Sequence, residues 1–419
     1  MTSEPSEAFV WTWLPGEEEP VVAGRLELAG GIVSFNYGRS YLARPDAIPL
    51  YLPELPLRPG AIAPLGGLTI AGCINDAGPD AWGQRVVMQH LLGSGVRQED
   101  TAVFGPLTYL LRSGSNRIGA LDFQDHADVY VSREETTATL SELMEAADAV
   151  SEGRALPPAL DLALLHGSSV GGARPKALVK DDGRDLIAKF SSSTDPYAIV
   201  KGEFAAMTLA ARAGLKTSSV ELWQVMGRDV LLVERFDRVS GTKRRRALVS
   251  ALTILGLDEM MARYASYADL AQIVRERFLD ARATLHELFA RIVFNILTGN
   301  SDDHARNHAA FWDGESLALA PAYDICPQLR AGGETSQAMT IGDDGYRMSR
   351  LAGCLERAST YMLTHNEARE LIDHQVDVIE HEWLDVCDLA RMTEVDRSLF
   401  WRRQFLNPYA FEGYSAAPA

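Results

Sequence analysis

The chain has 419 residues, of which 40 are Lys or Arg, 57 are Asp or Glu and 47% are hydrophobic. This composition is typical of a globular protein with one large domain or two to three ordinary ones, and it excludes disordered and fibrous classes. The formal net charge of −17 disfavours broad contact with nucleic acid, because binding to the phosphate backbone needs clustered cations.

Cysteine usage and hydropathy favour a cytoplasmic protein without membrane contact. The first residues are acidic and lack the basic and apolar regions of a signal peptide. The apolar run 292–294 is broken by Asn295 and falls far short of the roughly 20 residues that span a bilayer. The scattered cysteines fit reduced thiols: Cys73, Cys326, Cys354 and Cys387.

Short β-type runs separated by Gly and Pro dominate residues 9–123. Residues 32–37 have the composition of a strand and follow a Gly-Gly turn signal. Residues 80–92 have a helical pattern, in which we expect Trp82 to lie in the core. The first part of the chain is therefore predicted to be β-rich.

The middle of the chain mixes helices with a hairpin. A helix is predicted at 139–150, and residues 177–180 and 186–190 predict two strands joined by a tight Asp-Gly turn. Residues 203–213 predict a helix that a glycine terminates, and residues 229–236 predict another strand.

The last part is mainly helical. Residues 285–297 place apolar side chains at the spacing of a buried amphipathic helix. A short β pair is predicted at 309–311 and 317–319, and a further helix at 366–389. We expect three segments: a β-rich N-terminal domain at 1–128, a small lobe with a Gly-rich loop at 129–248 and a helical lobe at 249–419.

The densest polar motif follows the helix at 285–297. Asp302, Asn307 and Asp324 match the groups that phosphoryl transfer needs. One carboxylate orients the attacking hydroxyl, while an amide and a second carboxylate hold Mg²⁺ against nucleotide phosphates. The spacing from Asp302 to Asn307 is that of the kinase catalytic loop, and Asp324 stands where the metal-binding aspartate of a kinase would follow. Taken alone, the motif also fits a capped helix end with a solvated acidic loop.

A glycine-rich stretch at 167–176 precedes the predicted hairpin. It matches neither the Walker A pattern nor the kinase G-x-G-x-x-G pattern. Its glycines, followed by Arg174 and Lys176, can bring backbone N–H groups close to phosphates. In isolation an ordinary turn is the simpler interpretation.

Two more features follow in the order found in kinases. Lys189 ends the second strand of the hairpin and Glu203 opens the next helix, as in the lysine–glutamate pair that positions nucleotide phosphates. The strand at 229–236 ends in Glu-Arg-Phe-Asp, where a hinge can offer backbone hydrogen bonds to adenine. Each feature is weak alone, but their joint order is specific.

Four motifs together resemble those of the HipA family. The members of this family are serine/threonine kinases that act as toxins of bacterial toxin–antitoxin pairs. The motifs are GGARPKAL at 171–178, ERFDR at 234–238, DDHARN at 302–307 and PAYD at 321–324. The resemblance implies an α+β, bilobal protein-kinase-like fold, with a small β-rich lobe and a large helical lobe, preceded by a β-rich N-terminal domain.

The resemblance also implies ATP and Mg²⁺ as cofactors and a role for each matching residue. Asp302 would be the catalytic aspartate, with Asn307 and Asp324 as metal ligands. Ser169, or Ser168 beside it, would be autophosphorylated, which ejects the Gly-rich loop and switches the kinase off. The implied nucleotide-binding residues are Val170, Gly171, Gly172, Ala173, Arg174, Lys176, Lys189, Glu234, Phe236, His304 and Asn307.

In function, the resemblance implies phosphorylation of a translation target such as an aminoacyl-tRNA synthetase, which arrests growth. It implies a small helix-turn-helix antitoxin of HipB type as partner, so that DNA is contacted only through the antitoxin. One alternative is a catalytically silent nucleotide-binding co-repressor, which the retained Asp302, Asn307, Asp324 and Lys189 argue against. Another is a small-molecule phosphotransferase on the same fold.

Two remaining features have simpler interpretations. His304 and His308 suggest a metal hydrolase, but the glutamate of H-E-x-x-H is missing. We therefore expect His304 to pack beneath Asp302 and orient it. The basic run 243–246 is interpreted as a solvated hairpin loop rather than as a phosphate contact.

Overall fold

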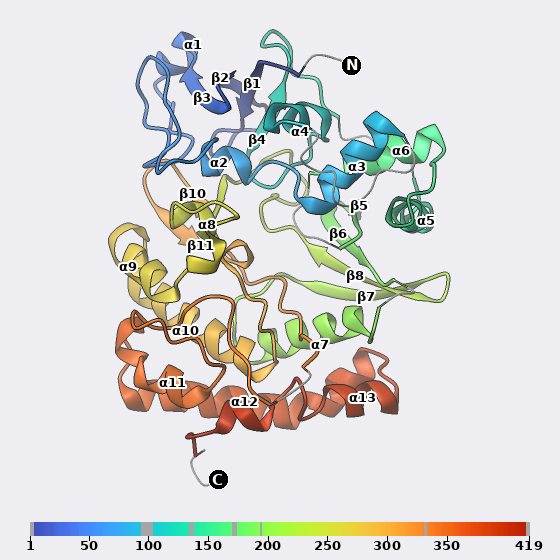
Figure 1. Cartoon of the computed structure of the whole chain (residues 1–419), viewed down its shortest axis with the longest axis vertical. Coiled ribbons are helices and arrows are strands. Elements are labelled where there is room, and N and C mark those ends of the chain that lie inside the picture. The colour runs from blue at the N-terminus through green and yellow to red at the C-terminus, as the bar shows by residue number, and fades with distance from the viewer. Residues whose placement is uncertain are drawn as a thin grey trace. The chain divides into compact units, whose positions relative to one another are not determined.

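The computed structural model describes residues 4–93, 104–133, 138–169, 174–192, 195–330 and 333–415. The chain divides into two compact units, each built from stretches that are separate in the sequence. The first unit comprises Met1–Ser192, Gln224–Val249 and Phe311–Glu315, and the second comprises Ser193–Trp223, Ser250–Ala310 and Ser316–Ala419. Figure 1 labels the elements of both units where there is room. The three segments expected from the sequence remain a prediction about domains.

The first unit begins with an antiparallel sheet of order β3-β2-β1-β4. Its strands are β1 (Glu7–Thr12), β2 (Val21–Ala29), β3 (Ile32–Tyr37) and β4 (Leu121–Gln124). Along β3 the buried residues Val33, Phe35 and Tyr37 alternate with more exposed ones, as expected for a strand with one face on a core. The strand predicted at 32–37 is confirmed.

Six helices of the first unit lie within its described residues. Asp80 caps α3, because its Oδ1 accepts a hydrogen bond from the N–H of Gly83, and Thr139 with Glu142 forms a capping box at the start of α5. The helices predicted at 80–92 and 139–150 are thereby confirmed. The helices are α1 (Arg39–Leu42), α2 (Gly72–Asn75), α3 (Ala81–Leu92), α4 (Pro106–Arg112), α5 (Leu140–Ser151) and α6 (Pro158–His166).

A second sheet of order β5-β6-β8-β7 contains the predicted hairpin. Its strands are β5 (Lys176–Asp181), β6 (Arg184–Phe190), β7 (Val220–Val225) and β8 (Arg228–Glu234). Asp182 and Gly183 turn the hairpin with φ of 45° and 75°, which is the conformation that a two-residue hairpin turn requires. Buried residues of β6 and β8, such as Ala188 and Leu232, form one core with Trp82 of α3, Leu143 of α5 and Leu164 of α6. Trp82 is therefore a core residue, as predicted.

The second unit is mainly helical, and α10 runs through its core. The helix begins after its N-cap Asp280 and carries twelve buried residues. The Nε2 group of Gln375 on α12 donates to the buried Ala290 carbonyl of α10, at 3.0 Å, and α7 lies alongside α12 (Figure 1). The helices are α7 (Ile199–Arg212), α8 (Ala251–Ile254), α9 (Tyr267–Arg277), α10 (Ala281–Leu297), α11 (Leu351–Glu356), α12 (His365–Leu389) and α13 (Glu394–Phe400).

A third sheet has the order β11-β10-β9 and contains β9 (Leu248–Ser250), β10 (Ala309–Trp312) and β11 (Leu317–Leu319).

Two expectations need correction. Glu203 does not open its helix: α7 begins at Ile199, because Ile199 and Val200 bury their apolar side chains and extend the helix toward its N-terminus. The basic run is not simply solvated either. Arg245 is only 7% exposed, stacks 3.6 Å above the Trp13 ring and donates to the Ser115 carbonyl at 2.8 Å.

Within the described parts of the chain, no helix combines the length and the apolar character that crossing a membrane would require.

Candidate active site

The candidate catalytic loop starts where α10 ends. Gly299 turns the chain with φ of 69°, and a Cβ at this position would lie 2.9 Å from the Gln404 carbonyl oxygen, so that only glycine fits. The next residue, Asn300, is buried and its Nδ2 donates to Asn295 Oδ1 on α10 at 2.9 Å. The loop is thus fixed to the core helix before it reaches Asp302.

Asp303 anchors this loop in the interior of the second unit. Its Oδ2 accepts hydrogen bonds from Asn295 Nδ2 at 2.7 Å, from His308 Nε2 at 2.9 Å and from the hydroxyl of Tyr267. Burial alone would raise the pKa of Asp303, but attraction to His308 and the hydrogen bonds from His308 and Tyr267 hold it below its ordinary value. Asp303 therefore serves as a buried, charged support for the loop. Sequence reasoning did not assign it, although a histidine five residues after an aspartate was a usable signal.

Asp302, the neighbouring residue, is exposed. Partial burial of its carboxyl group raises its pKa, the negative charges of Asp324 and Asp303 raise it further, and His304 opposes them. The two adjacent aspartates thus occupy opposite environments, one enclosed by donors and one facing outward beside a second acid. His304 is half-buried and precedes the short 3₁₀ helix Ala305–Asn307.

A second segment carries Asp324 to the same loop. The Ala322 backbone pairs with residues 216 and 218: its N–H donates to the Lys216 carbonyl at 2.7 Å and its carbonyl accepts from the Ser218 N–H at 2.9 Å. The Tyr323 hydroxyl then donates to the Arg306 carbonyl of the catalytic loop at 2.6 Å. Asp324 itself has φ of 60°, a conformation that non-glycine residues rarely adopt and that clusters at functional sites.

The second unit therefore brings Asp302, Asn307 and Asp324 close to one another. The Nδ2 of the buried Asn307 donates to the Asp302 carbonyl at 3.4 Å, which leaves its Oδ1 as an acceptor. Amide and carboxylate oxygens are the donors that Mg²⁺ prefers, and the repulsion between Asp302 and Asp324 is what a divalent cation would relieve. These residues fit a magnesium ion. A cluster of three His, Cys, Asp or Glu side chains able to hold a metal is absent from the described residues, which gives no support to the hydrolase interpretation.

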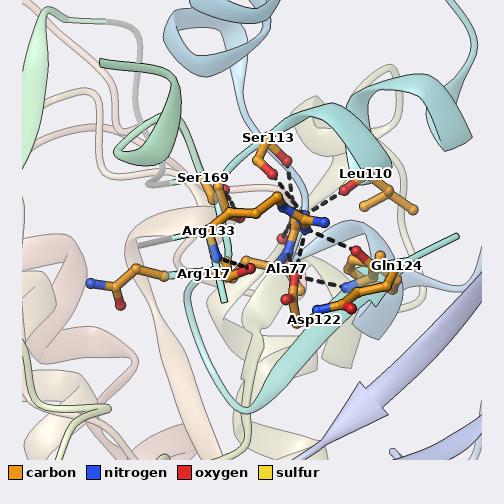
Figure 2. A network of polar contacts seen from close by, with 12 residues as sticks. Ala77, Leu110, Ser113, Arg117, Asp122, Gln124, Arg133 and Ser169 are labelled. Carbon is orange, nitrogen blue, oxygen red and sulfur yellow. Dashed lines mark hydrogen bonds and ion pairs between the residues drawn. The ribbon is translucent and has the colours of Figure 1, made fainter. Parts of the chain in front are cut away.

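The remaining predicted site residues lie in the first unit. Ser168 and Ser169 are fully buried: the Ser169 hydroxyl donates to the Gly114 carbonyl at 2.7 Å, and the Ser168 hydroxyl donates to the Leu165 carbonyl at 2.6 Å. Figure 2 shows Ser169 beside the buried polar network of Arg117. The next four residues of the predicted loop lie outside the described residues: Val170, Gly171, Gly172 and Ala173.

The far end of the predicted loop is held by α3. Lys176 is 3% exposed, its Nζ lies 3.7 Å from Asp80 Oδ2, and its carbonyl accepts from Trp82 Nε1 at 3.0 Å. Lys176 also lies directly opposite Lys189 in the β5–β6 register. Like charges in this arrangement repel one another, and the Asp80 carboxylate beside Lys176 relieves part of this repulsion. Arg174 is half-buried.

The predicted hinge follows β8. Glu234 and Phe236 are half-exposed, whereas Arg235 and Asp237 between and after them are buried. The Phe236 ring packs edge-on against the Phe311 ring, with centroids 5.8 Å apart. Glu234 and Phe236 therefore share one side of the segment, and the charged residues share the other.

Comparison with known proteins gives one family and several relatives. The model of the family described as the HipA-like C-terminal domain matches residues 168–383, which contain every predicted site residue. Protein Y4mE of Sinorhizobium fredii is 30% identical over 147 residues, covering 33% of this chain and 33% of that protein. The serine/threonine-protein kinase toxin HipA of Shewanella oneidensis is 25% identical over 206 residues, covering 42% of this chain and 47% of the toxin. The matches thus span a third to about half of the length of these curated relatives.

A solved structure extends the likeness to nearly the whole chain. A chain of the Shewanella oneidensis complex of HipA, HipB and operator DNA superposes with a TM-score of 0.70 at 18% identity, covering 96% of this chain and 97% of that chain. This likeness confirms the predicted fold class, an α+β protein-kinase-like fold preceded by a β-rich N-terminal part.

Proposed function

Because the chain belongs to the HipA-like C-terminal domain family, we propose that it is an ATP- and Mg²⁺-dependent protein serine/threonine kinase. The observation that carries the proposal is the pair of adjacent acids after α10. Asp303 is locked in the interior by three donors, and this holds Asp302 outward beside Asn307 and Asp324.

Asp302 is the catalytic residue in this proposal. Its carboxylate accepts a hydrogen bond from the hydroxyl of the substrate, orients the oxygen toward the γ-phosphate and takes up its proton. A raised pKa suits this role, since it increases the affinity of the carboxylate for that proton. Asn307 and Asp324 would hold Mg²⁺, which supplies neutralisation of the phosphate charge.

In the first unit, Lys176 and Lys189 are proposed to bind phosphate groups and the Glu234–Phe236 segment to bind the adenine. The two lysines lie directly opposite one another on β5 and β6, which places two cationic residues on one face of this hairpin. The predicted loop residues Val170 to Ala173, together with Arg174, would cover the nucleotide, and His304 would assist in the second unit. All these roles are parts of the proposal.

Autophosphorylation of Ser169, or of Ser168, is proposed to inactivate the kinase. Both hydroxyls are buried and bonded to backbone carbonyls, so neither can accept a phosphate until the segment opens. Once phosphorylated, the serine carries a charge of about −1.5 to −2 and cannot return to a site that offers it a carbonyl oxygen. The phosphorylated segment would therefore not return to its buried position.

The substrate is proposed to be a protein of translation such as an aminoacyl-tRNA synthetase, in the cytoplasm. A small helix-turn-helix antitoxin of HipB type is proposed as partner, with DNA contacted only through it. The antitoxin proposal is supported by the fold match to a HipA chain that was solved with HipB and operator DNA, and the charge of −17 suits a basic partner.

To test the substrate class, each aminoacyl-tRNA synthetase of the source organism would be incubated with the protein and ATP·Mg²⁺ and analysed for phosphopeptides by mass spectrometry. We expect phosphorylation of one synthetase by wild type and none by Asp302→Asn. Phosphorylation of none, while the kinase modifies itself, would contradict the synthetase proposal and leave the kinase proposal standing.

A further inference from the structure

The proposed hinge has a buried side that the kinase proposal does not use. Glu234 and Phe236 are half-exposed, but Arg235 is 4% exposed and Asp237 is 2% exposed. Charged side chains are almost never buried to this degree unless they are paired. The partners of these side chains therefore decide where the hinge backbone lies.

Both arginines of the motif donate to residues 116 and 117 of the N-terminal part of the chain. Arg235 Nη1 donates to Asn116 Oδ1 at 2.8 Å and to the Asn116 carbonyl at 3.1 Å, and its Nη2 donates to the Arg117 carbonyl at 2.6 Å. Arg238 Nη2 donates to the same Asn116 Oδ1 at 2.9 Å and to the same Arg117 carbonyl at 2.5 Å. One amide oxygen thus joins two guanidinium groups.

Asp237 closes this arrangement. Its Oδ2 accepts from the Gly119 N–H at 2.7 Å, from Arg235 Nη2 at 2.7 Å and from Arg238 Nη1 at 2.9 Å. Residues 235, 237 and 238 therefore hold residues 116–119 through side-chain contacts at both ends. The Asp237 carboxylate offsets one of the two guanidinium charges, and Asn116 Oδ1 and the Arg117 carbonyl accept hydrogen bonds from both arginines.

The segment 113–119 is itself rigid. The Arg117 guanidinium is fully buried and donates to Asp122 Oδ1 at 2.7 Å, to the Ala77 carbonyl at 3.1 Å, to Ser113 Oγ at 2.9 Å and to the Leu110 carbonyl (Figure 2). The carbonyl groups that receive Arg235 and Arg238 are consequently fixed in place. The Gly114 carbonyl in the same segment is the acceptor of the Ser169 hydroxyl.

We infer that residues 113–119, which we call the hinge support, set the position of the nucleotide hinge, with Asn116 as the positioning residue. This inference rests on the proposed kinase function. The hinge support lies outside residues 168–383, which the family model matches, so the nucleotide site depends on a part of the chain that precedes the kinase-like part. Small displacements of a hinge matter, because backbone hydrogen bonds to a ligand weaken steeply with distance and angle.

The test compares Asn116→Ala with Asn116→Asp, using fluorescent mant-ATP with Mg²⁺ as the probe and thermal unfolding as a second readout. Asn116→Ala removes the oxygen shared by both arginines, and we expect the dissociation constant of mant-ATP to rise about five- to tenfold. Asn116→Asp keeps an acceptor oxygen there, and we expect it to bind within about twofold of wild type. Arg238→Lys keeps the charge but loses the fork of donors, and serves as the second variant if Asn116→Ala does not fold; we expect it to weaken binding similarly.

Glu54→Gln is the matched control. Glu54 is a buried acid of the same unit whose carboxylate accepts from the Gly72 and Cys73 N–H groups at 2.7 and 2.8 Å. We expect it to lower the unfolding temperature without changing mant-ATP affinity. An unchanged affinity of Asn116→Ala for mant-ATP would overturn the inference but not the proposed function. A loss of affinity in Glu54→Gln as large as that in Asn116→Ala would do the same. Absence of mant-ATP binding by wild type would overturn both the inference and the proposed function.

Discussion

Asp302 and Asp303 show how two identical residues in sequence acquire different tasks. Asp303 points into the unit, where Tyr267, Asn295 and His308 surround it with donors, and its pKa is held low. Asp302 is exposed, and its pKa is raised. Substitution of Asp303 should therefore affect stability, and substitution of Asp302 should affect catalysis.

Asp303→Asn is expected to destabilise the protein by about 2–4 kcal/mol, because a neutral amide oxygen accepts the three buried hydrogen bonds more weakly than the carboxylate does. Urea unfolding measures this. The matched control is Asp302→Asn, which we expect to change the free energy of unfolding by less than about 1 kcal/mol, since the side chain is exposed and loses a like-charge repulsion. Equal losses in the two variants would contradict the division of tasks.

The positions of Asp302, Asn307 and Asp324 could be predicted because motif spacing follows the chain. The role of Asp303 could not, since Tyr267 and Asn295 reach it only through folding. The burial of Arg245 was missed for the same reason: its partner Trp13 lies far away in sequence.

Among the elements, strong local patterns were enough for several helices and strands. The helix α10, the β5–β6 hairpin and the β10–β11 pair all followed from periodicity and turn residues. Other elements were missed, among them α6 and β7. The helix α6 is short and begins with proline, and β7 is only partly buried, so neither carries a clear apolar period.

The close approach of Gly83 on α3 to the backbone of Ser168 gives a prediction for α3. A Cβ at Gly83 would lie 1.8 Å from the Ser168 carbonyl oxygen. Alanine is the better helix former by roughly 1 kcal/mol, so Gly83→Ala would stabilise an isolated α3. Here we expect it to destabilise the protein by about 2–4 kcal/mol and to displace the segment that carries Ser169.

Thermal unfolding and limited proteolysis near residue 168 measure both effects of Gly83→Ala. Gly38→Ala is the control, because the nearest atom to a Cβ there is 3.7 Å away. An unfolding temperature for Gly83→Ala at or above that of wild type would show that α3 and the serine segment are not in this close contact.

At the scale of the whole molecule, buried carboxylates should make stability depend on pH. The pKa values of Asp122, Asp237 and Asp303 are held below the ordinary value. Burial alone would raise these pKa values, but adjacent arginines at Asp122 and Asp237, and the groups of His308 and Tyr267 at Asp303, outweigh it. A group with a depressed folded-state pKa stabilises the fold above its unfolded value of about 4, and this contribution is lost as the pH falls.

We therefore expect the free energy of unfolding to be nearly constant from pH 7 to about 5 and to fall steadily between about pH 5 and 3. Denaturant titrations at each pH measure the curve. We expect Asp122→Asn to make this loss of stability with falling pH shallower. We expect Asp128→Asn, at an exposed aspartate, to leave the curve unchanged. Stability that stays constant down to pH 3 would contradict this account.

The division into two units was beyond prediction, because each unit gathers distant stretches of chain. In the first unit Trp312 Nε1 donates to the Pro49 carbonyl at 2.8 Å, across 263 positions of sequence. Nothing in the local pattern of either stretch indicates this pairing.

The most direct test of the proposed kinase activity is the intact mass and phosphosite map of the purified protein, before and after addition of ATP·Mg²⁺, compared with Asp302→Asn. The starting mass is needed because protein phosphorylated during expression would be inert in the assay. We expect phosphate on Ser169 or Ser168 in wild type and its absence in Asp302→Asn, with a rate loss of at least about a hundredfold. A wild-type protein that binds ATP yet carries no phosphate at either stage, or an Asp302→Asn variant phosphorylated as fast as wild type, would contradict it.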